Sequence, residues 1–167
     1  GENGEPEFVD RAPGFPKTGA DWPVTPEAFY YGIKFLTERY PLPLYITENG
    51  MSCHDNISAD GRVHDPNRIT FLDSYIGAMQ RASDEGADVR GYFLWTFLDN
   101  FEWSDGYKQR FGIIYVDFAT QQRIVNVQKE DFYLMVHIVF PLDFFTFTIT
   151  YILYVSKKKK SWRFTIF

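Results

Sequence analysis

The spacing of apolar residues in the first half of the chain predicts two amphipathic helices. The first is indicated by apolar side chains that recur every three or four residues: Phe29, Ile33, Leu36 and Tyr40. A second stripe with the same spacing follows further along: Ile69, Leu72, Ile76 and Met79. This spacing places the side chains of each group on one apolar face of a helix.

The sequence also predicts where each helix begins and ends. Each begins at a polar capping residue followed by proline, in the pairs Thr25-Pro26 and Asp65-Pro66. Pro41 is expected to end the first helix, and Gly86 suits the turn that ends the second.

A short strand is predicted after each helix. Residues 44–47 are β-prone and stop abruptly at Glu48, and a second strand is expected from Val89 to Phe97. Within the second strand, residues 92–95 are all apolar, so the side chains on both faces of the strand are apolar. This is typical of a parallel strand covered on both faces. Residues 111–118 and 123–127 alternate enough to predict a small hairpin. The order helix, strand, helix, strand therefore predicts an α/β fold built of βα units.

The composition and charge of the chain restrict the kinds of partner and bond that it can have. The 167 residues carry a net charge of −5, which argues against nucleic acid as partner, because phosphate binding needs a positive surface. Cys53 is the only cysteine, so no internal disulfide is possible and no metal site is indicated. A single cysteine and the absence of a signal-peptide pattern slightly favour a cytoplasmic location, although a start at Gly1 leaves the natural N-terminus open.

Glu48 is the first candidate for chemistry. In βα barrels the carboxyl ends of the strands open onto the active-site face, so a carboxylate at such an end is a catalytic candidate. A solvated loop acid would occupy the same position, and position alone leaves that interpretation open.

The end of the second strand carries a carboxylate between indoles: Trp95, Glu102 and Trp103. Sugar rings stack their apolar faces on aromatic side chains, while their hydroxyl groups bond to carboxylates and indole N–H groups. These residues therefore indicate a sugar site, although Trp95 alone could equally be a core aromatic residue.

Several motifs in series resemble glycoside hydrolase family 1, the β-glucosidase family. Tyr45-Ile46-Thr47-Glu48-Asn49-Gly50 resembles its nucleophile motif. Further segments match in the same order: 61–65, 88–93, 98–103, 106–107, 110–112, 116–118 and 120–121. The resemblance runs from about Thr18 to Ile124, and so many short patterns in one order make chance agreement a poor explanation.

The resemblance implies a role for each matching residue. Glu48 would be the catalytic nucleophile, and Trp95 the platform beneath the sugar ring. Glu102 would grip the outer hydroxyl groups of the non-reducing sugar, with Trp103 beside it and Phe111 as an aromatic wall. The implied reaction is hydrolysis of a β-linked terminal sugar with retention, without metal or cofactor. Because Trp103 is present, a non-phosphorylated sugar is expected.

A retaining mechanism also needs an acid, which the family takes from an Asn-Glu-Pro motif. The chain has no such motif; Asn3-Gly4-Glu5-Pro6 has the wrong spacing, so Glu5 is rejected. A (β/α)8 TIM barrel typically needs about 250 residues. Residues 1–125 are therefore predicted to form the C-terminal part of an incomplete barrel, with its last two strands. A non-catalytic carbohydrate-binding remnant or an inactive gene fragment remains the alternative.

Residues 126–167 do not match the family. They include a nearly uncharged run from Phe132 to Val155, followed by four lysines at 157–160. The segment could come from an intron or a shifted reading frame in A/T-rich DNA, or it could be a membrane anchor, a buried β-rich segment or a divergent final helix. The membrane span is not favoured, because Asp143, Pro141 and His137 interrupt the run.

Overall fold

The computed structural model describes residues 11–126 and, for their backbone pairing alone, residues 153–158 and 161–166. Two helices and two longer strands come first in the chain, followed by a 3-10 turn and a small hairpin. In order these are α1 (Pro26–Arg39), β1 (Leu44–Asn49), α2 (Pro66–Asp84), β2 (Val89–Leu94), η1 (Trp103–Asp105), β3 (Ile114–Val116) and β4 (Arg123–Val125).

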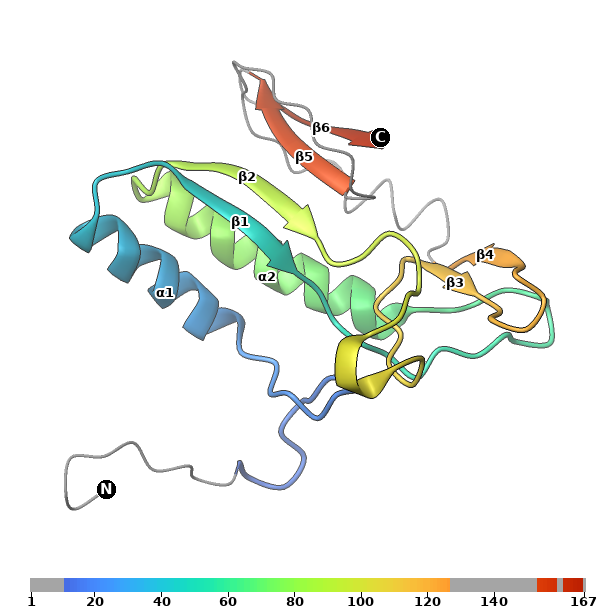
Figure 1. The fold of residues 1–167 in the computed structure, drawn as a ribbon. Coiled ribbons are helices and arrows are strands. Elements are labelled where there is room, and N and C mark those ends of the chain that lie inside the picture. The colour runs from blue at the N-terminus through green and yellow to red at the C-terminus, as the bar shows by residue number, and fades with distance from the viewer. Residues whose placement is uncertain (1–10, 127–152, 159–160, 167) are drawn as a thin grey trace.

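β1 and β2 are parallel neighbours, as the βα pattern predicts. Their pairing runs from Leu44 opposite Val89 to Asn49 opposite Leu94. Figure 1 shows α1 and α2 side by side on one face of this strand pair, with η1 and the β3–β4 hairpin beyond the carboxyl ends of the strands. The core lies between helices and strands, and its deeply buried apolar side chains include Met79, Leu72, Tyr92, Ile33 and Leu94.

Both predicted helix starts are confirmed, but the two caps differ. Asp65 accepts a hydrogen bond from the Arg68 backbone N–H and so caps α2 as expected. Thr25 occupies the N-cap position of α1 without a capping bond from its hydroxyl group. Its backbone N–H donates to the Tyr75 hydroxyl at 2.9 Å, which fixes the start of α1 through α2 instead. Gly86 follows α2 with a φ of 102°, in the left-handed region that favours glycine.

The apolar face predicted for α1 is partly wrong. Ile33 is buried and Phe29 packs against the core, but Leu36 and Tyr40 are 42% and 53% exposed. The helix packs on α2 through Tyr30 and Ile33, so its contact face is rotated from the predicted stripe. The described part of the chain places no element against the remaining apolar side of α1.

The second strand ends three residues earlier than predicted, at Leu94. Trp95 still donates its N–H to Asn49 O at the end of β1, and the next residue bonds to the hairpin segment: Thr96 donates its N–H to Phe111 O and accepts from Ile113 N–H. The pairing with β1 ends where β1 itself ends, at Asn49. The hairpin itself is confirmed, with β3 and β4 antiparallel and Tyr115 opposite Ile124.

The tail contributes two strands to the larger sheet, β5 (Leu153–Lys158) and β6 (Ser161–Ile166). β5 is antiparallel to β2, and the strand order is β1-β2-β5-β6. Most of the apolar run from Phe132 lies outside the described residues. Neither described helix combines the length and hydrophobicity that crossing a bilayer requires. Asn126, predicted to begin the tail, is 1% exposed and bonded to the hairpin, so the folded unit includes it.

Candidate active site

A pocket of about 380 Å³ opens at the carboxyl ends of β1 and β2. Its size falls within the range of about 300–1,000 Å³ that ligand pockets occupy. All five residues that the sequence analysis selected line this pocket: Glu48, Trp95, Glu102, Trp103 and Phe111. The structure therefore brings together residues that lie up to 63 positions apart in the chain, from 48 to 111.

Glu48 lies inside β1, not one residue beyond it as predicted. The parallel pairing resumes at Asn49, so the strand extends past the glutamate. A register shift between Ile46 and Asn49 interrupts the ladder at this point. Such irregularities re-aim side chains near the ends of strands. The Glu48 side chain is exposed at the pocket, where a carboxylate can reach a bound molecule.

Two pocket walls meet at Gly50 with almost no space between them. A Cβ atom built on Gly50 would lie 1.6 Å from the carbonyl oxygen of Trp95, so only glycine fits. Just before it, Asn49 O accepts the Trp95 N–H at 2.9 Å, and the Asn49 side chain accepts from the buried Tyr92 hydroxyl at 2.8 Å. These contacts hold the segment after Glu48 against the segment that carries Trp95.

Glu102 and Trp95 are directly bonded. The indole Nε1 of Trp95 donates to a carboxylate oxygen of Glu102 at 3.3 Å. Glu102 precedes η1, and its backbone N–H donates to Gly106 O at 2.7 Å, which closes the loop. The neighbouring Trp103 has a φ of 40° and is 83% exposed, so its ring stands at the rim of the pocket.

The loop between β2 and β3 is held from beneath by Asp99. This buried carboxylate accepts from the Gly112 and Val116 N–H groups, at 3.0 and 3.2 Å, and from the Arg110 guanidinium. The arrangement fixes the backbone on both sides of Phe111, which is 5% exposed and forms the far wall.

Several pocket residues escaped the sequence analysis. Trp22 approaches Phe111 with ring centroids 6.2 Å apart, and Phe71 stacks on Tyr75 at 4.1 Å. The last two lie four residues apart on α2, beside the stripe that was assigned to the core. A second apolar stripe on that helix was the available signal. Trp22 lies in a segment rich in proline and glycine that has no periodic pattern, so nothing local marked it.

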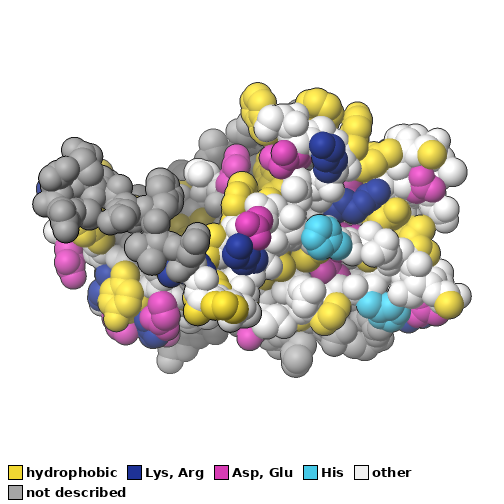
Figure 2. Space-filling model, turned by 90° about the horizontal axis from the view of Figure 1, so that it is seen from below, with side chains coloured by type: hydrophobic (Ala, Val, Ile, Leu, Met, Phe, Trp, Pro, Cys, Tyr) yellow, Lys and Arg dark blue, Asp and Glu magenta, His cyan; other side chains and the backbone are white. Residues whose placement is uncertain are grey.

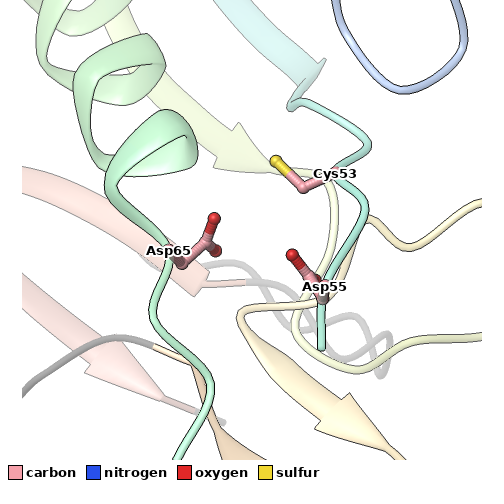
Figure 3. Close-up of side chains that lie close together, drawn as sticks. All are labelled: Cys53, Asp55 and Asp65. Carbon is pink, nitrogen blue, oxygen red and sulfur yellow. The ribbon is translucent and has the colours of Figure 1, made fainter. Parts of the chain in front are cut away.

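Three potential metal ligands have ligand atoms within 4.8 Å of one another: Cys53, Asp55 and Asp65. Figure 3 shows the two carboxyl groups facing the same space, one from the loop after β1 and the other from the start of α2. The Arg68 guanidinium bonds to both carboxylates and is fully buried with them. Burial raises the pKa of the Cys53 thiol to about 11, so the thiol keeps its proton at neutral pH. The group is thus a buried ion cluster whose cation is arginine, and it does not fit a metal.

The exposed charges are mixed in sign. Figure 2 shows Lys and Arg side chains scattered among Asp, Glu and apolar side chains, without a continuous basic area on the face displayed. This distribution offers no phosphate-binding stripe there.

Together the fold and the pocket define an α/β protein whose site opens at the carboxyl ends of parallel strands. The family model described as Glycosyl hydrolase family 1 matches residues 2–140. The chain therefore belongs to glycosyl hydrolase family 1. The matched range continues past residue 125, where the sequence analysis drew its boundary.

Individual relatives agree with this. The chain is 51% identical over 120 residues to β-glucosidase A of Thermotoga maritima, covering 71% of this chain and 26% of that protein. It is 48% identical over 120 residues to a 1,4-β-D-glucan glucohydrolase of Thermotoga neapolitana, covering 71% and 27%. The structure of the T. maritima family 1 β-glucosidase with isofagomine lactam superposes with a TM-score of 0.71 at 46% identity, covering 77% and 29%. The chain spans about a quarter of the length of these curated relatives.

Proposed function

We propose that this chain provides the nucleophile side of a retaining β-glucosidase site, with Glu48 as the nucleophile. The observation that carries the proposal is the convergence of the five selected residues on one pocket. Trp95 would be the platform for the sugar ring. Glu102 and Trp103 would hold the outer hydroxyl groups, with Phe111 as the wall. The substrate class is a β-linked, non-reducing terminal sugar without a phosphate group.

The proposed chemistry proceeds in two displacements. A Glu48 oxygen attacks the anomeric carbon, and the bond from that carbon to the leaving oxygen breaks as the oxygen takes up a proton. The product is an ester between the sugar and Glu48. Water then attacks the same carbon, its proton passes to the group that protonated the leaving oxygen, and the carboxylate is released with the original configuration restored.

Glu102 is the only other carboxylate that lines the described pocket, but we do not assign it as the acid. An acid must aim its proton at the leaving oxygen, about 5–5.5 Å from the nucleophile on the other side of the bond. Glu102 instead accepts the indole N–H of Trp95, the proposed ring platform. By resemblance, the acid would belong to an Asn-Glu-Pro motif that these 167 residues do not contain.

The exposed side of α1 supports an incomplete barrel. Tyr31, Phe35 and Leu36 are 65%, 56% and 42% exposed, and Tyr45 on β1 is 51% exposed. A preceding βα unit of a (β/α)8 barrel would cover both the helix and the open edge of β1. We therefore propose that the complete site requires further βα units.

The nucleophile can be tested without the acid. A 2-deoxy-2-fluoro-β-glucoside with a dinitrophenolate leaving group needs no proton to depart, and the fluorine slows release of the ester. Incubation of the chain followed by peptide mass spectrometry should locate the sugar on Glu48, and Glu48→Gln should remain unlabelled.

The competing function is a non-catalytic carbohydrate-binding site, favoured by the aromatic residues that line the pocket. Titration with isofagomine lactam separates the two. Binding without any label on Glu48 would favour the binding module. A label on Glu102 would overturn the assignment of the nucleophile.

A further inference from the structure

Arg68, at the start of α2, is a charged residue whose side chain has no solvent exposure. Burying a guanidinium is costly unless its donors are satisfied, and here its donors bond in four directions. Two of these partners are the carboxylates of Asp55 and Asp65. The other two are backbone carbonyl groups from the two segments that form the pocket walls.

The first carbonyl belongs to Met51, which accepts from Arg68 Nε at 3.2 Å. Met51 directly follows Gly50, the residue after β1 that lies against the Trp95 carbonyl group. The second carbonyl belongs to Arg110, which accepts from Arg68 Nη2 at 2.9 Å. Arg110 directly precedes Phe111, the buried wall. One rigid guanidinium therefore joins the segment after Glu48 to the segment before Phe111.

The two carboxylates hold this guanidinium in place and are themselves anchored. Asp55 accepts from Arg68 Nη2 at 3.0 Å and from Asn126 Nδ2 at 3.0 Å, and that same amide nitrogen donates to Gly112 O at 2.9 Å. The network thus reaches the hairpin behind Phe111. The flat fork of arginine can satisfy several acceptors at once, which a lysine ammonium on the same stem cannot do.

We propose that Arg68 is a positioning residue for the glycosidase reaction, one that sets the spacing between the Glu48 strand and the Phe111 wall. It touches no substrate and acts through the two carbonyl groups. This inference rests on the proposed function, because the spacing matters only if a sugar must be held against Glu48. A shift of about 1 Å in such a site lowers reaction rates by about 100-fold.

The test measures how fast the 2-fluoroglucoside labels Glu48 in the full chain and in Arg68→Lys, as a function of reagent concentration. The rate constant at saturation is expected to fall about 10- to 100-fold, while the half-saturating concentration changes less than about threefold. Arg81→Lys is the matched control. It lies on the same helix and pairs with the exposed Glu27, away from the pocket. Its rate constant should equal that of the unsubstituted chain.

A purely structural role would lower the folded fraction, measured by circular dichroism, and leave the rate constant of the folded molecules unchanged. That result for Arg68→Lys would overturn the proposal. If this variant does not fold, Asp55→Asn decides the matter, because it removes the negative charge of one partner of the guanidinium and keeps both carbonyl contacts. It should slow labelling at least about threefold, and an unchanged rate constant would overturn the proposal. Failure of the unsubstituted chain to be labelled would instead overturn the proposed function and this inference with it.

Discussion

Trp95 donates its indole N–H to Glu102, seven residues further along the chain, at a distance of 3.3 Å. A hydrogen bond therefore links the proposed ring platform to the proposed acceptor for the sugar hydroxyl groups. A sugar that stacks on the indole would meet the carboxylate at a set position. A change in either residue is expected to disturb the contribution of the other.

The isolated chain is expected to show no measurable turnover of simple aryl β-glucosides whose leaving groups need a proton. General acid catalysis is worth about 100- to 10,000-fold, and the described pocket supplies no group that we assign to it. Release of the phenol, followed by absorbance, measures this. Robust hydrolysis that disappears in Glu48→Gln would show that the chain holds its own acid.

Within a complete barrel, Glu48→Ala is expected to abolish hydrolysis. A suitable host is the β-glucosidase A of T. maritima with residues 11–126 of this chain in place of its matching segment. Azide should restore part of the activity, because a small anion can attack the anomeric carbon from the vacated space and form a glycosyl azide. A chimera whose Glu48→Ala variant still forms the retained sugar at the original rate would contradict the nucleophile assignment.

Gly50→Ala should destabilise the fold by about 3 kcal/mol or more, since the new methyl group would meet the Trp95 carbonyl at 1.6 Å. Gly77→Ala is the matched control, because nothing lies within 4 Å of its Cβ position. In the interior of α2 this second change should stabilise by about 0.5–1 kcal/mol. Urea unfolding of both variants measures the free energies. Equal effects would show that the contact at Gly50 is not as close as described.

Alkaline pH should destabilise the chain through Cys53. Burial is the main reason that the pKa of its thiol rises from 9.0 to about 11; the Arg68 charge opposes this and the Asp55 charge adds to it. Well below pH 9 both folded and unfolded thiols are protonated, so this group does not change stability there. Between pH 9 and 11 only the unfolded thiol loses its proton, and stability falls by about 2–3 kcal/mol. Urea unfolding of Cys53→Ala should lack this part of the decline. A variant with the same pH dependence as the unsubstituted chain would contradict the prediction.

Deleting residues 127–167 should leave every proposed sugar contact in place and reduce aggregation. The assigned residues end at Phe111, and the folded unit extends to Asn126. The deleted segment is long, apolar and rich in β-formers, a composition that promotes aggregation when exposed. Sedimentation of both forms without detergent compares them. Lower solubility of the shortened chain would indicate that uncovering the edge of β2, which β5 holds, outweighs the removal of the apolar segment.

Local sequence patterns predicted a helix or strand well where residues close in sequence determine where it begins. The starts of α1 and α2 follow from Thr25-Pro26 and Asp65-Pro66, because capping and proline chemistry act within a few residues. The motif around Glu48 likewise led to the pocket, because a strand end carries its side chains to one edge of the sheet.

Long-range contacts account for what the sequence did not reveal. After the end of β2, Thr96 forms backbone hydrogen bonds with Phe111 and Ile113, and no local sequence pattern predicts these bonds. The buried side of α1 depends on which helix lies beside it. The role proposed for Arg68 depends on carbonyl groups 17 residues before it and 42 residues after it, which a sequence pattern cannot locate.

The strand order β1-β2-β5-β6 has a consequence for assembly. In a (β/α)8 barrel every strand runs parallel to its neighbours, and the last strand closes the ring against the first. Here the outer edge of β2 already holds an antiparallel strand, with Tyr92 opposite Val155. Any separately made set of βα units would have to displace β5 before the ring could close. Completing the barrel would then be a strand-exchange reaction, and its speed would depend on how readily β5 leaves.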